Sequence, residues 1–319
     1  MITVKTRHRR NLLVHPRQWL CHGGRAFALA FTWMLTVSTV HAQNKPVLDG
    51  SSTLTTNEVS ASGASGTGTA APDEEADLAK KLNNPVADLI SVPIQNNWDF
   101  GLGPADAMKY TANIQPVIPV SIGPDWNVII RTILPVIYQG ALDDNPLAPA
   151  SARESHSGLG DTTQSFFLSP KNPVGGWILG AGPVMYYPTA TDSALGAGKW
   201  GAGPTLVALR QDHGFTYGVL ANHIWSFAGW GPQNVNSTFL QPFFGYTTKT
   251  YTTLMLNTES TYDWQNHQWT VPLNAMVTQL VKIGGKPVAF QFGYRYYAER
   301  PAGGPDWGLR FTITFLFPK

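Results

Sequence analysis

The chain has little charge, a single cysteine and no long hydrophobic run after its first 42 residues. Only 13% of its 319 residues are charged, about half the usual share in soluble domains. The lone cysteine, Cys21, excludes a disulfide scaffold and a zinc ribbon. The most apolar later stretch, 128–137, is broken by Arg131 and Pro135. A bundle of membrane-spanning helices needs runs of about 18 apolar residues and is therefore excluded.

The first 42 residues have the features of a cleaved signal peptide. Six basic residues and no acid stand in the first 25 positions, residues 26–40 form an apolar stretch, and Val40 and Ala42 match the cleavage site. An uncleaved N-terminal anchor is the alternative. Cleavage would remove 6 of the 22 basic residues and leave 16 against 20 acidic ones, a net charge of −4. An acidic mature chain gives no support to a nucleic-acid partner.

Residues 43–86 are expected to precede the folded domain as a leader. Their first part, 43–72, is dominated by Ser, Thr, Gly and Ala, which cannot fill a core, and is expected to be disordered. Residues 73–82 have four acids before two lysines and two leucines one helical turn apart, which predicts a short periplasmic helix. The helix either plugs a pore or hangs in solution, and the second alternative is the simpler one.

From about residue 88 onward, apolar and polar side chains alternate, as they do in β-strands with two different faces. In the last strand one face carries Arg310, Thr312 and Thr314, while the other is entirely apolar. Aromatic residues, 12% of the chain, gather toward the strand ends. An apolar outer band, aromatic girdles and a tolerant inner face are typical of a transmembrane β-barrel. A soluble β-sandwich would show the same alternation.

Loop lengths favour the barrel over the sandwich. About twelve strands are expected, and short connections alternate with mostly longer ones, at 140–158, 189–198, 229–236, 263–267 and 298–306. Short periplasmic turns and longer outer loops are typical of bacterial outer-membrane barrels. Residues 87–319 are therefore predicted to form an all-β, antiparallel transmembrane β-barrel. Prolines remove donors from the ladder, so bulges are expected at Pro116, Pro135, Pro183, Pro242 and Pro272.

Several short motifs that occur in order give the barrel region a family resemblance. They are NPVADLI at 84–90, NIQPVIP at 113–119, GLGD at 158–161, GAGPT at 201–205, ANHIWS at 221–226 and FLFPK at 315–319. Together they resemble the MetA-pathway of phenol degradation family of outer-membrane barrels, often labelled only as transporters or misnamed neuromedin U. The resemblance implies a barrel that passes small, including aromatic, molecules, with no established catalytic residue. Such barrels commonly end on an aromatic residue, whereas here Phe317 is followed by Pro318 and Lys319.

Charged residues on the expected inner face form the first candidate site. They are Asp99, Arg131, Glu259, Arg295, Glu299 and Arg310. Ionisable groups inside a membrane must be paired or hydrated. We therefore expect the three arginines to face the two glutamates across a constriction that selects solutes by size and charge. The alternative, favoured by the small lumen of about twelve strands, is an ion-pair network that only fills the barrel.

Phe239 and Phe243 form the second candidate site. They share a strand face with Gln241, opposite Leu240 and Phe244. If this face points inward, the two rings would line an apolar path for aromatic solutes, because ligand sites are mostly apolar with few polar groups. A register slip of one residue would turn them toward lipid instead.

No catalytic site is predicted. His223 and Ser226 are three residues apart on an expected strand and point to opposite faces, so they cannot meet as base and nucleophile. The sequence contains no nucleophile elbow, phosphate loop or dinucleotide fingerprint and no cluster of metal ligands. We expect no enzyme activity, no cofactor and no metal.

Taken together, these patterns predict an exported outer-membrane channel for passive diffusion of small solutes, including hydrophobic or aromatic ones. Its expected partners are outer-membrane lipid and lipopolysaccharide, the barrel-assembly machinery and the solute, but not nucleic acid. Two other classes stay open, an outer-membrane lipid-modifying enzyme and a structural or adhesive barrel.

Overall fold

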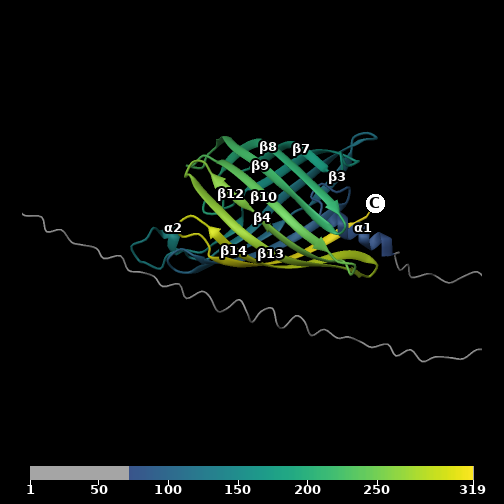
Figure 1. Ribbon diagram of the computed structural model, residues 1–319. Helices are drawn as coiled ribbons and strands as arrows, with labels where there is room; N and C mark the ends of the chain where they lie inside the picture. The colour runs from purple at the N-terminus through teal and green to yellow at the C-terminus, as the bar shows by residue number, and fades with distance from the viewer. Residues whose placement is uncertain (1–71, 319) are drawn as a thin grey trace, which may run out of the picture. The chain divides into compact units, whose positions relative to one another are not determined.

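The computed structural model describes residues 72–318, which form a closed antiparallel β-barrel of 12 strands (Figure 1). The predicted signal peptide, residues 43–71 of the predicted leader and Lys319 lie outside the described residues. None of the described helices is long and apolar enough to cross a membrane. The elements are α1 (Pro72–Leu82), β1 (Ile90–Leu102), β2 (Ala107–Ile114), β3 (Val117–Ser121), β4 (Trp126–Gln139), α2 (Ala150–Arg153), β5 (His156–Leu159), β6 (Thr162–Pro170), β7 (Ile178–Tyr187), β8 (Lys199–Asp212), β9 (Phe215–Gly229), β10 (Asn236–Thr247), β11 (Thr252–Thr258), β12 (Ser260–Asp263), β13 (Gln268–Ile283), β14 (Lys286–Glu299) and β15 (Trp307–Phe317).

Three of the barrel strands are each interrupted once, as β2 and β3, β5 and β6, and β11 and β12. The barrel closes where β1 pairs with β15, from Ile90 opposite Phe317 to Phe100 opposite Trp307. Every neighbouring pair of strands is antiparallel, as predicted, and the closed ladder leaves no long free edge that could pair with another chain.

The longest loops lie at one end of the barrel and mostly short turns at the other, as predicted (Figure 1). The exceptions are 103–106 and 264–267, which are as short as turns, and 171–177, a longer connection among the turns. The end with the start of β1 and the close of β15 also carries the turns at 122–125, 171–177, 213–214, 248–251 and 284–285. Gly284 and Gly285 both have positive φ, +57° and +77°, the conformation that a two-residue hairpin requires. We call this end the turn end and the opposite one, which carries α2, the loop end.

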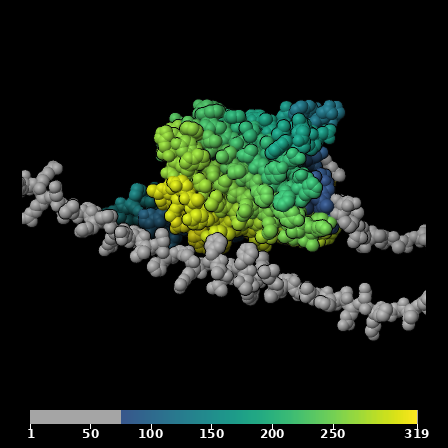
Figure 2. All heavy atoms as spheres, viewed as in Figure 1, coloured from purple at the N-terminus to yellow at the C-terminus, as the bar shows by residue number. Residues whose placement is uncertain are grey.

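The predicted alternation of faces is confirmed. In β15 the side chains of Arg310, Thr312 and Thr314 are buried inside the barrel, while Phe315 and Phe317 are 40% and 49% exposed on its outside. Figure 2 shows one side of this outer surface. Large exposed hydrophobic side chains occur on nearly every strand, which is the surface that hydrocarbon requires.

The prolines are accommodated in different ways. Pro116 falls in the gap between β2 and β3, and Pro272 lies at a register shift between β13 and β14. Pro135 faces the break between β5 and β6, where the register with β4 shifts by one residue. The pairs on either side of Pro116 keep one register, as do those around Pro183 and Pro242. The expectation of a bulge is therefore confirmed at Pro272 and opposite Pro135, and it was wrong for Pro116, Pro183 and Pro242.

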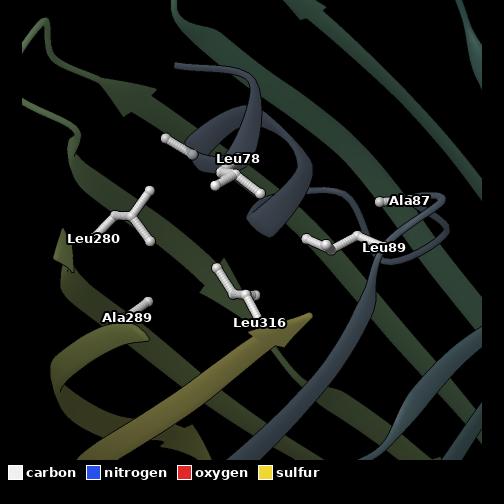
Figure 3. Close-up of a cluster of buried hydrophobic side chains, with 7 residues drawn as sticks. Leu78, Ala87, Leu89, Leu280, Ala289 and Leu316 are labelled. Carbon is white, nitrogen blue, oxygen red and sulfur yellow. The ribbon is translucent and has the colours of Figure 1, made fainter. Parts of the chain in front are cut away.

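Helix α1 does not hang in solution but packs against the inner wall of the barrel at the turn end (Figure 3). Leu78 and Ala79, only 4% and 2% exposed, meet an apolar patch of Leu280, Ala289 and Leu316. This patch interrupts the polar inner face at the turn end of the barrel, where β13 and β15 finish and β14 begins. The structure thus favours the plug, the alternative that the sequence left second.

Polar contacts fix the end of the helix in the same place. Asn83 donates through Nδ2 to Thr247 Oγ1 and Thr253 Oγ1, both at 3.2 Å. Gln211 Nε2 donates to the carbonyl oxygen of Lys80 at 2.8 Å. We call α1 and the following residues 83–89 the N-terminal plug.

Candidate solute path in the barrel lumen

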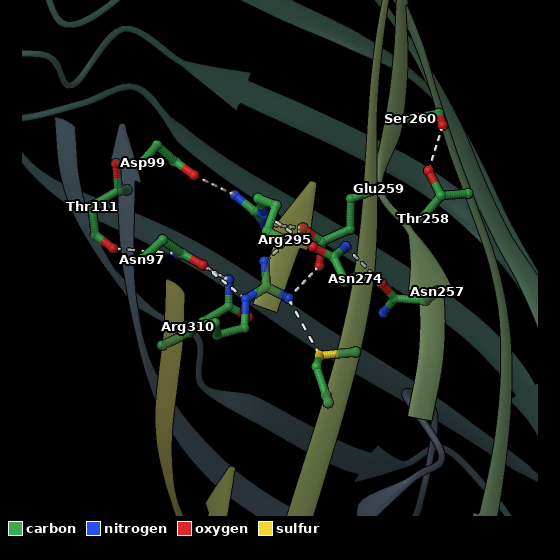
Figure 4. Close-up of polar contacts among 12 residues, drawn as sticks. Asn97, Asp99, Thr111, Asn257, Thr258, Glu259, Ser260, Asn274, Arg295 and Arg310 are labelled. Carbon is green, nitrogen blue, oxygen red and sulfur yellow. Dashed lines mark hydrogen bonds and ion pairs between the residues drawn. The ribbon is translucent and has the colours of Figure 1, made fainter. Parts of the chain in front are cut away.

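Glu259 is the centre of a charged cluster on the inner face (Figure 4). Its carboxylate accepts a hydrogen bond from Arg295 Nη2 at 2.6 Å and two from Arg310, through Nη1 at 2.8 Å and Nη2 at 2.7 Å. Two guanidinium groups thus share one carboxylate, in the charge-assisted geometry that gives the strongest protein hydrogen bonds.

Neighbouring strands hold each guanidinium in place. Arg295 donates through Nε to Asn274 Oδ1 at 2.9 Å, and Arg310 donates through Nε to Asn97 Oδ1 at 2.8 Å. Each asparagine is the register partner of its arginine on the adjacent strand. Asp99 adds a second carboxylate, 3.4 Å from Arg295 Nη1. Both arginines are at least nine-tenths buried, so the cluster narrows the lumen as a fixed network.

The backbone at Glu259 is outside the ladder because prolines lie on both sides of it. The pairs Asn257–Phe243 and Ser260–Leu240 leave Pro242 and Gln241 opposite residues 258 and 259. On the other side, the pairs with β13 leave Pro272 opposite Glu259. Proline has no N–H to donate, and the strand is accordingly interrupted between β11 and β12.

The structure brings together only part of the expected constriction. Arg131 faces the lumen but is hydrogen-bonded to Gln115 Oε1, at 3.0 Å, and not to a glutamate. Glu299 is exposed at the loop end of β14, where it accepts from Gln268 Nε2 at 3.2 Å. The expectation that Glu299 faces the arginines was therefore wrong.

Phe239 and Phe243 point inward, as one of the two register alternatives required. Both pack against a buried apolar cluster on the inner wall that includes Val86 of the N-terminal plug. The rest of this cluster comes from β4, β6, β8 and β9, as Ile129, Phe167, Val207, Leu209 and Leu220. One side of the lumen is thus apolar and the side around Glu259 is polar.

A cavity of about 230 Å³ lies between the N-terminal plug and the charged cluster. Asn83 and Ala87 of the plug, Glu259 and Arg310 of the cluster, and Phe243 of the apolar side all line it. No feature of the sequence showed this cavity, because it exists only where the plug, which precedes β1, meets strands from the whole chain.

The β7–β8 loop, 188–198, is anchored to the barrel by Asp161, a residue that the sequence analysis did not single out as functional. The Asp161 carboxylate accepts hydrogen bonds from the Tyr186 hydroxyl at 2.8 Å and from the backbone N–H groups of Ala190 and Ala197 at 3.1 and 2.6 Å. Gly158, in the same GLGD motif, leaves room for Thr191 of this loop, which a Cβ at Gly158 would meet. The motif therefore seats the loop on β5 and β6.

Three other loops at this end are linked through their backbones. The N–H of Gly103 donates to Gly303 O at 2.9 Å, that of Ala105 to Leu142 O at 3.1 Å, and that of Leu142 to Ala152 O at 2.8 Å. These bonds join the β1–β2, β4–β5 and β14–β15 connections. The loop end is consequently a cross-linked rim.

The β7–β8 loop is expected to loosen as the pH rises above neutrality. His156 Nδ1 lies 2.8 Å from Asp192 Oδ2, and this hydrogen bond raises the pKa of His156 above its ordinary 6.5. The N–H of Ala194 and then His156 lower the pKa of Asp192 below 3.8. A raised histidine pKa gives stability that is lost as the pH rises through it, and a lowered aspartate pKa gives stability that is lost as the pH falls through it.

The ion pair is therefore complete between about pH 4 and pH 6.5. Limited proteolysis within 188–198, followed from pH 6 to pH 9, should become faster in the native protein. The His156→Gln variant should be cleaved at a rate that does not change over this range. An equal pH dependence in both proteins would contradict the prediction.

Solved structures of other outer-membrane barrels resemble this chain. The chain is similar to a COG4313 outer membrane channel from Pseudomonas putida F1, with a TM-score of 0.55, 16% sequence identity and coverage of 72% of this chain and 94% of that one. The chain has the fold of an outer-membrane β-barrel. OmpF of Salmonella typhi is less similar, with a TM-score of 0.35, 9% identity and coverage of 72% and 96%. No family model and no curated protein matches the sequence.

In this outer-membrane barrel fold, His223 and Ser226 lie apart, as their spacing predicted. His223 Nδ1 is 2.7 Å from Thr238 Oγ1, and its ring lies 4.0 Å from that of the half-exposed Trp225. Ser226 Oγ accepts from the N–H of Val235 at 2.9 Å. Each side chain thus has a structural partner of its own.

Proposed function

We propose that this protein is an outer-membrane channel for the passive diffusion of small solutes. The observation that carries the proposal is a closed barrel with an apolar outer face and a largely polar inner face that lines a partly enclosed cavity. Such a wall separates hydrocarbon from a hydrated interior. Export through a signal peptide cleaved after Ala42, and contact of the outer face with lipid and lipopolysaccharide, belong to the same proposal.

Two features control the proposed path. A solute entering at the loop end first meets the cluster around Glu259 and then the cavity. The N-terminal plug closes the far side of this cavity. Phe243 lines the cavity as an apolar wall, so we extend the proposal to solutes with an aromatic body.

Reconstituted native protein should give small, discrete single-channel currents in planar bilayers. Liposomes that contain it should swell in isotonic alanine and in isotonic phenylalanine, because the path is narrow but has both polar and apolar walls. Boiled protein serves as the control. Absence of both currents and swelling would overturn the proposal, and release of fatty acid from the lipid would favour an enzyme instead.

A further inference from the structure

The middle of the lumen holds more positive than negative charge. Among the described inward-facing residues of this region, Arg131, Arg295, Arg310 and Lys109 face three carboxylates, those of Asp99, Asp161 and Glu259. Four basic groups against three carboxylates leave one positive charge. A surplus of one sign between low-dielectric walls concentrates ions of the opposite sign.

Arg131 is the basic group of this region that faces the cavity with no carboxylate in direct contact, although Glu259 is near enough to interact with it electrostatically. Among the described residues no ion pair reaches it within 4.0 Å, whereas Arg310 shares Glu259. A guanidinium has five N–H donors, and the hydrogen bond to Gln115 uses one of them. The remaining donors form a charged edge at the cavity wall.

Apolar side chains stand next to this charged edge. Val117 is the register partner of Arg131 across the β3–β4 ladder, so the two side chains point to the same side. Val117, Phe243 and Met255 all line the same cavity. A solute that filled it would meet a cation at one end and hydrocarbon along its body.

The cavity is only partly enclosed, and its volume sets the size of the part of a solute that it can hold. About 230 Å³ is below the range of about 300–1,000 Å³ that holds drug-sized ligands. It is several times the roughly 30 Å³ that one water occupies in the liquid. The space therefore suits a molecule with one ring or a short acyl chain.

We propose that Arg131 binds the carboxylate of small apolar acids, and that single-ring or short-chain monocarboxylates are the solutes of this channel. Guanidinium and carboxylate match in a bidentate, charge-assisted pair, while Val117 and Phe243 bury the apolar body. This inference rests on the proposed channel function and names its solute class.

Calorimetric titration of the full-length protein in detergent tests the site, with benzoate as the probe. Benzamide has the same shape without the charge, benzylammonium has the opposite charge, and acetate lacks the ring. Benzoate should bind at least tenfold more tightly than each of the three. The Arg131→Gln variant should lose at least tenfold in benzoate affinity, and Arg131→Lys should lose less, because it keeps a point charge.

Arg153→Gln, an exposed position in α2, is the matched control and should bind benzoate like the native protein. A difference in gel mobility between unheated and boiled samples checks that each variant is folded. If Arg131→Gln does not fold, the comparison of benzoate with benzamide on the native protein decides. Equal binding of these two compounds, no binding of benzoate, or unchanged binding by a folded Arg131→Gln variant would overturn the inference. Channel currents without benzoate binding overturn only this inference. Binding without currents or swelling overturns the channel function and the assignment of a transported solute, and leaves only the binding site at Arg131.

Discussion

Ala79→Asp is expected to raise the single-channel conductance several-fold, because it should drive the N-terminal plug out of the turn end of the barrel. Ala79 is 2% exposed and packs against apolar wall residues such as Leu280 and Ala289. An ionised carboxylate buried there without a partner costs at least several kcal/mol. Helix α1 takes no part in the strand ladder, so it can leave while the barrel stays folded.

Ala76→Asp is the matched control, since it adds the same charge to an exposed position of the same helix. It should leave the conductance at the native value. Currents recorded in planar bilayers from the two variants and the native protein decide the matter. Equal conductance in all three proteins would show that the plug does not limit the current.

Glu259→Gln is expected to destabilise the barrel and to shift the ion selectivity of the channel toward anions. The variant leaves Arg295 and Arg310 without the carboxylate that both now share. Removing one partner from a buried ion pair costs about 3–5 kcal/mol. The surplus of positive charge in the middle of the lumen would also increase by one.

The measurements are the temperature at which the gel mobility of the folded barrel is lost and the reversal potential in a salt gradient. Glu299→Gln, the same substitution at an exposed position of the loop end, should change neither. If Glu259→Gln kept both the native unfolding temperature and the native reversal potential, the cluster would be neither a structural nor an electrostatic element of the lumen.

Much of the barrel could be predicted from the sequence because successive residues of a strand point to opposite faces of the sheet. The alternation placed Arg295 and Arg310 inside and Leu309 outside, as the structure has them. The same reasoning failed at Glu299. A register shift at Val271 and Pro272 disturbs the alternation near the end of β14, and a bulge of this kind cannot be seen by counting along one strand.

The partners within the lumen could not be predicted for a different reason. The faces of single strands show which residues point inward, but strand tilt and stagger decide which of them meet across the barrel. Glu259 therefore meets Arg310 and Arg295, while Arg131 stays with Gln115. One usable signal in the sequence was missed. Inward apolar residues at the strand ends, such as Leu280 and Leu316, are unusual on a polar inner face, and in the structure they contact α1.

The contacts of the N-terminal plug also set an order of events in folding. Asn83 bonds to Thr247 and Thr253, which follow it by 164 and 170 residues. Its apolar neighbours come from β13, β14 and β15, the last strands of the chain. Contacts between such distant residues form only after the intervening chain is arranged. The N-terminal plug, which precedes every strand in the sequence, is thus among the last segments to reach its native position. Its docking indicates that β1 and β15 have already paired.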